Sequence, residues 1–493
     1  MSQETERHGG GKARLWQNWV SLSGLMVVIA AFFAFVLLWL LELFAGSSNP
    51  YVGILAFLVA PGFMILGIAL FVAGILVERR RVHRSREPRA LVIDLASPKH
   101  RRTLLIFSSC SIGFLFLTAL GSYQTFHLTE STTFCGEVCH TVMEPERVAY
   151  QDGAHARVSC VECHIGSGAE WFVRAKLSGS YQVYATLFNK YPRPVPTPIK
   201  NLRPAQDTCE QCHWPESFVG DVVRTVRSFQ GDEEGSEYSV KLELKVGGAD
   251  PTRGPTSGIH WHMNVANKVE YFAEDESRQT IPWVRVTDRE GQVTVYRADG
   301  YEDEVDESKV RRMDCMDCHN RPAHNFHSPN KAVNLAISLG RLDRALPYIK
   351  TNAVYALVQE YSTKDEAMSE IGDFIQSKYR DQDPNVVAKA VEEVRAIYGR
   401  NFFPAMKASW LSYPNNIGHK EWPGCFRCHD DNHKTEDGEK VLELSRCDAC
   451  HIILAQGSGD ELDQLDAKGQ PFRHPGEEYD TGWLCSDCHN GGL

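Results

Sequence analysis

Residues 134–164 read FCGEVCHTVMEPERVAYQDGAHARVSCVECH and contain two cysteine pairs, each followed directly by a histidine. The second pair, Cys160-Val-Glu-Cys163-His164, has two residues between its cysteines, and five later segments repeat this C-x-x-C-H spacing. In such a motif two thiols can bond to two vinyl groups of one porphyrin, and the adjoining imidazole can bind the iron. The stretch therefore predicts covalent attachment of c-type haem.

The first pair departs from this spacing, because three residues separate Cys135 from Cys139. We still interpret it as an attachment site, which brings the predicted number of haems to seven. The predicted attachment cysteines are Cys135, Cys139, Cys160, Cys163, Cys209, Cys212, Cys315, Cys318, Cys425, Cys428, Cys447, Cys450, Cys485 and Cys488. The predicted proximal iron ligands are His140, His164, His213, His319, His429, His451 and His489.

Two other chemistries use paired cysteines. Pairs of C-x-x-C segments can form four-cysteine zinc sites, and scattered pairs can form disulfides. Neither chemistry requires a histidine directly after every pair, so the sequence favours haem. The one cysteine outside the pairs, Cys110, lies in an apolar run and is interpreted as a packing residue.

An electron-transfer haem generally takes a second strong ligand. Twelve histidines lie outside the motifs, and the nine that follow residue 126 could supply this ligand. The favoured candidates are His155, His324, His419, His433, His474 and one of His260 and His262. Those last two lie in Gly-Ile-His-Trp-His and would share one side of an extended segment. For the first haem, Met143 is an alternative ligand, because a thioether raises haem potential relative to two histidines.

Three apolar runs are long enough to cross a bilayer, which needs roughly 20 helical residues. They are Val20–Leu41, Tyr51–Val77 and about Leu104–Phe126. Three basic residues precede the first run, none lies between Glu42 and Tyr51, and nine lie between Arg79 and Arg102. By the positive-inside rule this pattern predicts a cytoplasmic N-terminus and a periplasmic segment after the third run.

Charge is unevenly distributed along the 493 residues. Up to Phe126 the chain holds 12 Lys and Arg against 6 Asp and Glu, whereas the whole chain has a net charge of -11. A basic apolar front and an acidic soluble remainder indicate a domain anchored to a membrane. The acidic remainder argues against nucleic acid as a partner.

The predicted fold is a membrane-anchored multihaem cytochrome c, with three transmembrane helices and a haem-packed, mostly α-helical and irregular periplasmic domain that carries a small β insertion. Residues 237–300 alternate apolar and polar side chains, which predicts strands with a turn near Glu290-Gly291, and 330–398 predict three helices. The expected order is a cytoplasmic tail (1–14), two transmembrane helices (15–77), a basic cytoplasmic loop (78–103), a third transmembrane helix (104–126), a four-haem domain (127–320) containing the insertion, a helical insert (321–424) that spaces two haem groups, and a three-haem domain (425–493).

Residues 134–168, then FVRAKLSGSYQVY (172–184) and DTCEQCHWPESFVGD (207–221), resemble the NapC/NirT family of membrane-anchored multihaem cytochromes. The resemblance covers about Thr118–Trp214 and continues more weakly to His319. It implies a quinol dehydrogenase that oxidises menaquinol or ubiquinol. The seven sites and extra spans are similar to the enlarged inner-membrane cytochromes of metal-respiring bacteria.

The resemblance also implies roles for single residues. His155 matches a distal ligand, Lys176 matches the quinol-site lysine, and Met143 roughly matches the methionine of the first haem. The first motif and its methionine gap are each one residue longer than is usual in the family, and Gln182 stands where some members have an acidic residue. The proton-accepting carboxylate is therefore open among Glu144, Glu146 and Asp152.

We expect an inner-membrane quinol dehydrogenase, with menaquinol as the expected donor, that passes electrons through seven haems to periplasmic c-type cytochromes or reductases. Such a protein would serve anaerobic or extracellular respiration. One alternative is a terminal reductase in which a haem lacks a second protein ligand and binds nitrite or a similar substrate. Another is a passive relay subunit whose quinol site belongs to a partner. The sequence leaves the final acceptor and the oligomeric state open.

Overall fold

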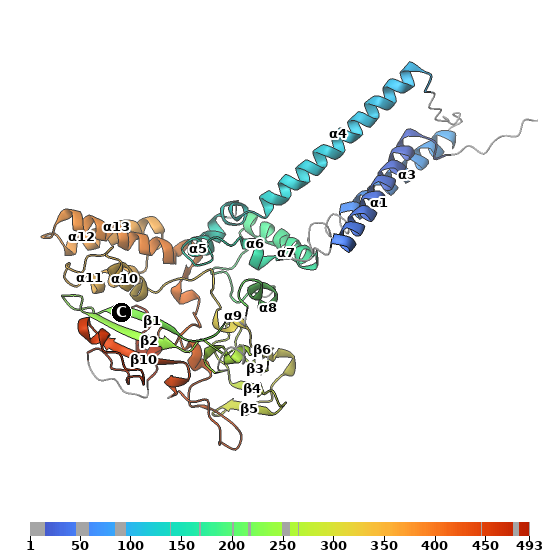
Figure 1. The fold of residues 1–493 in the computed structure, drawn as a ribbon. Helices are drawn as coiled ribbons and strands as arrows, with labels where there is room; N and C mark the ends of the chain where they lie inside the picture. Colours follow the sequence, from blue (N-terminus) through green and yellow to red (C-terminus); the bar gives the residue numbers. More distant parts are fainter. Residues whose placement is uncertain are drawn as a thin grey trace, which may run out of the picture. The chain divides into compact units, whose positions relative to one another are not determined.

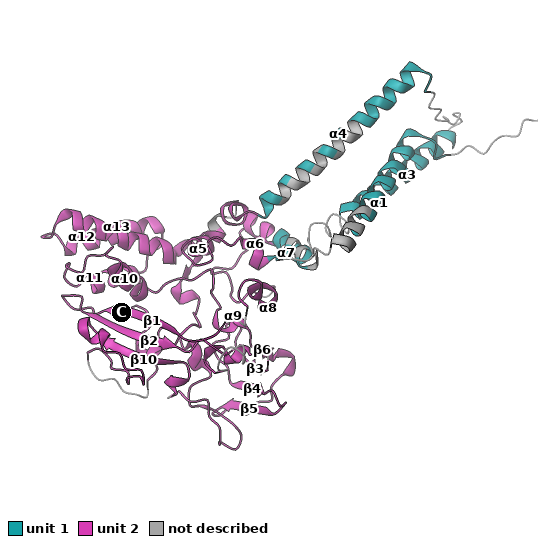
Figure 2. Cartoon of the chain, viewed as in Figure 1, with its two compact units in different colours: residues 1–130, 165–181 teal, residues 131–164, 182–493 magenta. Residues whose placement is uncertain are grey.

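The computed structural model describes most of the chain in two compact units (Figure 1, Figure 2). The described residues are 15–45, 59–83, 95–138, 140–166, 169–199, 202–214, 218–248, 257–264, 266–444, 446–476 and 483–492. The first unit comprises Met1–Glu130 and Ile165–Tyr181, and the second comprises Ser131–His164 and Gln182–Leu493.

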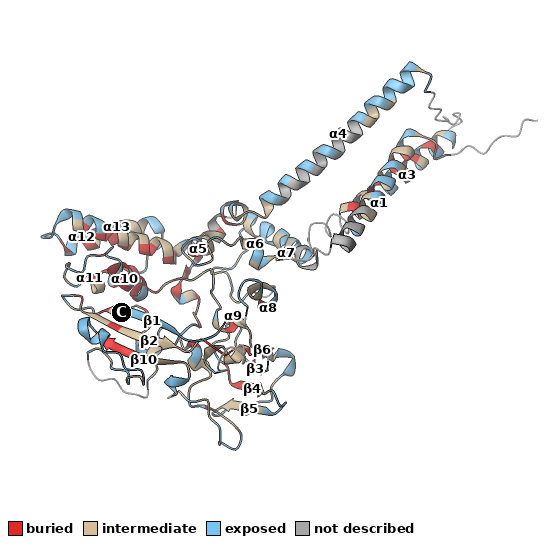
Figure 3. Ribbon diagram, viewed as in Figure 1, coloured by how far each residue is buried: buried red, intermediate tan, exposed pale blue. Residues whose placement is uncertain are grey.

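Three long helices form most of the first unit: α1 (Trp19–Ala45), α3 (Ala60–His83) and α4 (Pro98–Thr129). Within the described residues, segments of α1 and α3 are long and apolar enough to cross a membrane. Their outward side chains are exposed, including Phe33 and Ile65 (Figure 3), as lipid-facing residues would be. The predicted third span falls within α4 and stays a prediction, and residues 51–58 of the predicted second span lie outside the described part.

Helices α1 and α3 pack closely along a line of small residues. A β-carbon at Gly67 would lie 2.8 Å from the Gly24 carbonyl oxygen, so the two backbones meet directly there. Ser21 Oγ donates to the Phe71 carbonyl at 3.1 Å, and Asn18 Nδ2 donates to the Gly74 carbonyl at 3.2 Å. Small residues and interhelical hydrogen bonds of this kind hold helices together in lipid, where the hydrophobic effect does not.

Two antiparallel sheets organise the second unit. One has the strand order β1 (Val222–Phe229), β2 (Glu237–Leu244), β10 (His451–Gly457). The other has the order β6 (Arg311–Arg312), β3 (Lys268–Phe272), β4 (Trp283–Thr287), β5 (Val293–Ala298), β9 (His433–Lys434). The predicted strands and the β4–β5 turn are confirmed, with Gly291 at φ +82°, a conformation that suits glycine.

Strand pairing joins the segments predicted as a four-haem domain and a three-haem domain. Strand β10 comes from the C-terminal segment and pairs with β2, and β9 pairs with β5. The C-terminal segment therefore completes both sheets of the predicted insertion, and both groups of motifs belong to one compact unit. Sequence spacing missed this because strand pairing joins segments that are far apart in the chain.

The predicted helical insert contains four helices, one more than the three expected from the sequence. They are α10 (Pro329–Ser338), α11 (Ile349–Val358), α12 (Lys364–Lys378) and α13 (Pro384–Asn401). Capping explains three of the starts: Ser328, Thr363 and Asp383 each accept a hydrogen bond from a first-turn amide. These helices hold the largest described apolar core (Figure 3), with Val333, Leu357, Ile371 and Ile375 fully buried.

Shorter elements connect these parts. They are η2 (Phe134–Val138), α5 (His140–Gln151), α6 (Cys160–His164), α7 (Ala169–Leu187), α8 (Ala205–Thr208), η3 (Cys209–Gln211), η5 (Ile259–Met263), η6 (Glu307–Lys309), α9 (Cys315–Cys318), β7 (Phe402–Phe403), η7 (Pro404–Met406), β8 (Ala408–Ser409), η8 (Trp410–Ser412), η9 (Gly424–Arg427), η10 (Cys447–Ala449), η11 (Gly459–Asp463) and α14 (Cys485–Cys488).

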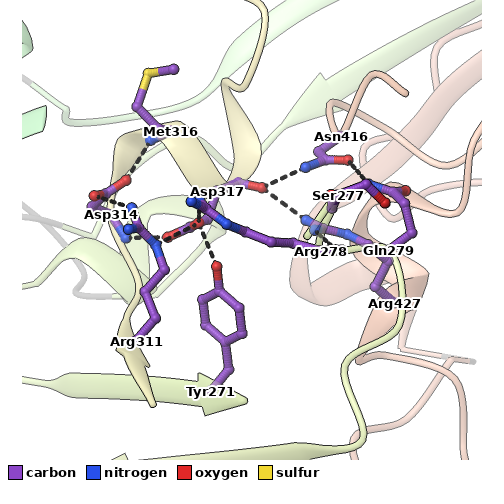
Figure 4. A network of polar contacts seen from close by, with 10 residues as sticks. All are labelled: Tyr271, Ser277, Arg278, Gln279, Arg311, Asp314, Met316, Asp317, Asn416 and Arg427. Atoms are coloured by element: carbon purple, nitrogen blue, oxygen red, sulfur yellow. Dashed lines mark hydrogen bonds and ion pairs between the residues drawn. The ribbon is translucent and has the colours of Figure 1, made fainter. Parts of the chain in front are cut away.

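A buried carboxylate joins several of these elements (Figure 4). Asp317, in α9, is 2% exposed and accepts hydrogen bonds from Tyr271 Oη at 2.6 Å, Arg278 Nη1 at 2.9 Å and Arg311 Nε at 3.2 Å. Its carbonyl accepts from Arg427 Nη2 at 2.8 Å. Burial, together with the nearby Asp317 carboxylate, raises the pKa of the Tyr271 hydroxyl, so this tyrosine stays a hydrogen-bond donor.

Asp317→Ala should destabilise the second unit by about 3 kcal/mol, because it removes a buried carboxylate and leaves two half-buried guanidinium groups without their shared partner. The change would be measured as the denaturation midpoint of the haem-loaded protein. Asp381→Ala, at an exposed position, is the matched control and should change the free energy of unfolding by less than about 0.5 kcal/mol. Equal midpoints for the two variants would contradict the structural role of Asp317.

Candidate functional site

Each of the six C-x-x-C-H motifs contains a short helical turn. In the third motif the His213 amide donates to the Cys209 carbonyl at 2.8 Å, and His319 and His489 donate in the same way within their motifs. A helical turn places residues three apart on one face, so both thiols of a motif can reach one edge of a porphyrin. The turn thus provides the attachment geometry that the spacing predicts.

The competing chemistries find no support among the described residues. All thirteen described cysteines of the motifs are free, so they form no disulfides. No group of three or more His, Cys, Asp or Glu side chains is arranged for a metal ion in the described residues, as a four-cysteine zinc site would require. Cys139 and the His140 side chain lie outside that part of the chain.

Six motif histidines each face a histidine from elsewhere in the sequence. The pairs, with the distances between ring centres, are His164–His324 at 6.1 Å, His213–His155 at 6.1 Å, His319–His260 at 6.4 Å, His429–His262 at 6.0 Å, His451–His419 at 6.2 Å and His489–His474 at 5.8 Å. Every C-x-x-C-H motif is therefore matched with one partner imidazole.

These separations fit a metal ion between the two rings. A metal–imidazole bond is about 2 Å long and the ring centre lies roughly 1 Å further, so two ligands of one ion have ring centres about 6 Å apart. Four of the partner imidazoles are also oriented through Nδ1, which leaves Nε2 for the metal. The Nδ1 contacts are His155 to the Pro322 carbonyl (3.1 Å), His260 to that of Val246 (2.7 Å), His262 to that of Ile259 (2.9 Å) and His324 to that of Glu146 (2.9 Å).

Burial favours the neutral imidazole that metal ligation requires. Desolvation lowers the pKa of His164, His262 and His319, and it lowers that of His429 to about 4. In each case a neighbouring histidine adds to the lowering. These rings therefore accept a metal without first losing a proton at neutral pH.

A buried arginine further tests whether the interior of the second unit fits a haem. Arg203 is 7% exposed, and its Nε and Nη1 atoms have no hydrogen-bond partner among the residues that the structure describes. A buried guanidinium without an acceptor is costly, and a carboxylate is its preferred partner. A haem carries two propionate carboxylates, so the unpartnered arginine suits a haem-loaded interior as the paired histidines do.

Three of the predicted partner histidines have environments that the sequence did not indicate. His260 and His262 lie on one 3-10 turn, η5, and each faces a different motif histidine, where the sequence analysis expected one of them to bind iron. His433 has other contacts. Its Nδ1 contacts Asp430 Oδ1 at 2.8 Å and its Nε2 contacts the Ile281 carbonyl at 2.6 Å, so both ring nitrogens are already used.

The predicted quinol-site carboxylates separate into different environments. Glu146 pairs with Arg321 at 3.1 Å and lies 3.3 Å from His324 Nδ1, so it orients a partner histidine. Glu144 pairs with Lys364 at 2.9 Å beside a cavity of about 120 Å³. Asp152 is exposed. The role of each carboxylate at a quinol site stays a prediction.

The other predicted quinol-site residues are less constrained. Met143 is half-buried on α5. Position 176 falls in α7, and the Lys176 side chain lies outside the described part. Sequence reasoning also missed Arg321, Asp317 and Arg203. Arg321, in CHNRPAHNFH directly after the fourth motif, had a signal, because a basic residue there can hold a carboxylate near the haem.

Comparisons with known proteins agree with this site. Residues 97–195 match the model of the NapC/NirT cytochrome c family, N-terminal region. The chain is 40% identical over 490 residues to "Cytochrome c-type protein ImcH" of Geobacter sulfurreducens, which covers 96% of this chain and 95% of that protein. No solved structure matches the chain. With its paired cysteines, facing histidines and apolar helices, the chain belongs to the NapC/NirT family of membrane-anchored c-type cytochromes.

Proposed function

We propose that this protein is an inner-membrane quinol dehydrogenase that carries seven c-type haems and delivers electrons to periplasmic c-type cytochromes or reductases. The observation that carries the proposal is the set of six facing histidine pairs, each with one motif histidine. Two strong axial ligands suit a haem to electron transfer rather than to substrate binding. Membership of a membrane-anchored cytochrome family supports the quinol pool as the donor.

Haems held at the attachment motifs would supply one-electron acceptor chemistry, so that oxidation of one quinol would use two haems and release two protons to the protein and water. In this proposal the Lys176 ammonium hydrogen-bonds a quinol oxygen and stabilises the negative charge that develops there. Glu144 and Asp152 are the favoured proton acceptors, since both are more exposed than Glu146, which pairs with the buried Arg321. Met143 is the proposed alternative ligand at the first motif.

The same observation weighs against a terminal reductase. Such an enzyme needs an iron position open to substrate, and each of the six C-x-x-C-H motifs has a facing imidazole. A relay subunit without its own quinol site remains the competing hypothesis. Direct reduction of the purified protein by a menaquinol analogue, followed at the haem absorption bands, separates a quinol dehydrogenase from a relay.

The proposed topology has three spans, with α4 as the third. The N-terminus and the basic segment 79–102 then lie in the cytoplasm, and everything after residue 126 lies in the periplasm. This arrangement places the attachment motifs in the compartment where c-type haem is loaded and where soluble cytochromes can collect electrons.

Haem stoichiometry tests the attachment sites. Seven motifs should give about seven haems per chain by pyridine haemochrome analysis against protein mass. A value near six would remove the first, longer motif from the set. Zinc in place of iron would contradict the proposal.

Substitution of Lys176 tests the quinol site. Lys176→Ala should slow quinol oxidation at least about tenfold, which corresponds to ~1.4 kcal/mol of transition-state stabilisation. Haem content and the dithionite-reduced spectrum should not change. Lys389→Ala, at an exposed position of α13, is the matched control and should oxidise quinol at the wild-type rate. Wild-type turnover in Lys176→Ala would remove this lysine from the quinol site.

Substitution of the partner histidines tests the ligand assignment. His260→Met and His262→Met should each raise the reduction potential of one haem, and the double variant should raise two, because each residue faces a different motif. Redox titration followed by optical and EPR spectroscopy would count the affected haems. His433→Asn should leave the ligation of every haem unchanged. Loss of a low-spin haem in that variant would restore His433 as a ligand.

A further inference from the structure

We propose that the attachment motifs lie in space in the order in which they occur in the sequence, so that the haems they hold form one unbranched series from the first motif to the seventh. The order stands on contacts between motifs. The direction of electron flow, from first to seventh, rests on the proposed quinol dehydrogenase function. The inference adds the path by which electrons cross the domain.

The first four motifs follow one another through thiol and imidazole contacts. The Cys135 and Cys160 thiols are hydrogen bonded, which joins the first motif to the second. His155, five residues before Cys160, faces His213 with ring centres 6.1 Å apart, which joins the second motif to the third. The Cys209 and Cys315 thiols are hydrogen bonded, which joins the third to the fourth.

A second contact supports the link between the third and fourth motifs. His155 faces His213 of the third motif, and its Nδ1 contacts the carbonyl of Pro322 at 3.1 Å. Pro322 follows the fourth motif closely in the chain. Helix α8, which precedes the third motif, also packs against α9 of the fourth.

The fourth and fifth motifs meet at the point where the sequence separates the two groups. A single turn, η5, carries both His260, which faces His319, and His262, which faces His429. Arg427, within the fifth motif, donates to the Asp317 carbonyl of the fourth motif at 2.8 Å (Figure 4). The long helical insert thus leaves these two motifs in direct contact.

The series continues to the C-terminal motifs. Phe426, between the two cysteines of the fifth motif, stacks on His419 with ring centres 4.2 Å apart, and His419 faces His451 of the sixth motif. Strand β10 begins at His451 of the sixth motif, and its Ile453 carbonyl accepts a hydrogen bond from the Gln470 amide at 2.8 Å. The segment that follows Gln470 carries His474, which faces His489 of the seventh motif. Each of these contacts joins consecutive motifs.

Proximity of the motifs has a direct consequence for electron transfer. Thioether bonds fix one porphyrin edge to each motif, so neighbouring motifs bring the edges of neighbouring porphyrins together. Transfer between redox centres slows steeply as their edges move apart. Consecutive contacts therefore define a series in which each internal position has two neighbours and each end has one.

Removal of an internal haem tests the series. A Cys425→Ala/Cys428→Ala variant lacks the fifth attachment site and should bind six haems. In proteoliposomes with a menaquinol analogue, four of them should be reduced at the wild-type rate, and two, at the sixth and seventh motifs, should stay oxidised. Dithionite should reduce all six. Rapid quinol reduction of all six would overturn the unbranched order.

Removal of the terminal haem is the matched control. A Cys485→Ala/Cys488→Ala variant should also bind six haems, and the quinol should reduce all six, because no motif follows the one removed. If the fifth-site variant does not assemble with six haems, a Cys447→Ala/Cys450→Ala variant replaces it. In that variant five haems should be reduced rapidly and one should stay oxidised, and rapid reduction of all six would overturn the order.

An equilibrium measurement tests the spatial order of the motifs independently of the quinol reaction. In EPR-monitored redox titrations, removal of the fifth haem should change the signals or potentials of two other haems, and removal of the seventh should change those of one. Changes at three or more haems after the fifth is removed would overturn the series. Wild-type protein that is not reduced by the quinol would contradict the proposed function and leave this equilibrium test in place.

Discussion

The structure depends on one constraint: a C-x-x-C-H motif supplies only one axial ligand, and a six-coordinate haem must take the other from elsewhere in the chain. Each facing histidine therefore brings together two segments that are far apart in the chain, as when His262 faces His429 or His164 faces His324. Strand pairing between distant segments is compatible with this requirement. Strand β10 begins at His451, a motif histidine, and pairs along β2, so the pairing that completes the sheet also positions a ligand.

This constraint also explains where ordinary packing is found. The conventional apolar core is concentrated in α10–α13, which carry no attachment motif, while the regions around the motifs have smaller apolar clusters. Polar networks take over the role of the core between motifs. The Asp317 carboxylate in α9 accepts hydrogen bonds from Tyr271 and from two arginines. Arg427 of the fifth motif donates to the Asp317 carbonyl and so connects the network to that motif. A buried charged network that is fully satisfied fixes geometry in a way that interchangeable apolar contacts do not.

Much of this could be predicted from the sequence, and the failures have one physical cause. The motifs, the apolar helices and the β4–β5 hairpin follow from local spacing, because each depends on neighbouring residues, whereas the motif that each partner histidine faces does not. The separate three-haem domain and the roles of His262, His433 and Glu146 depend on which distant segments meet. Nothing in the sequence around His433 distinguishes an imidazole with a free Nε2 from one bonded to the Ile281 carbonyl. A role for Arg321 could be predicted from its position directly after the fourth motif, whereas the burial of Arg203 could not be predicted from its sequence neighbours.

The shared turn η5 shows how ligand supply and electron path become linked. Because His260 and His262 lie on one turn, their partner motifs must approach each other, and a substitution that moves this turn would displace two ligands at once. Helices α10–α13 lie between these motifs in sequence but not in space. The insert can therefore vary in length without lengthening the path, since η5 and the Arg427–Asp317 contact, not the intervening chain, set the separation of the fourth and fifth motifs.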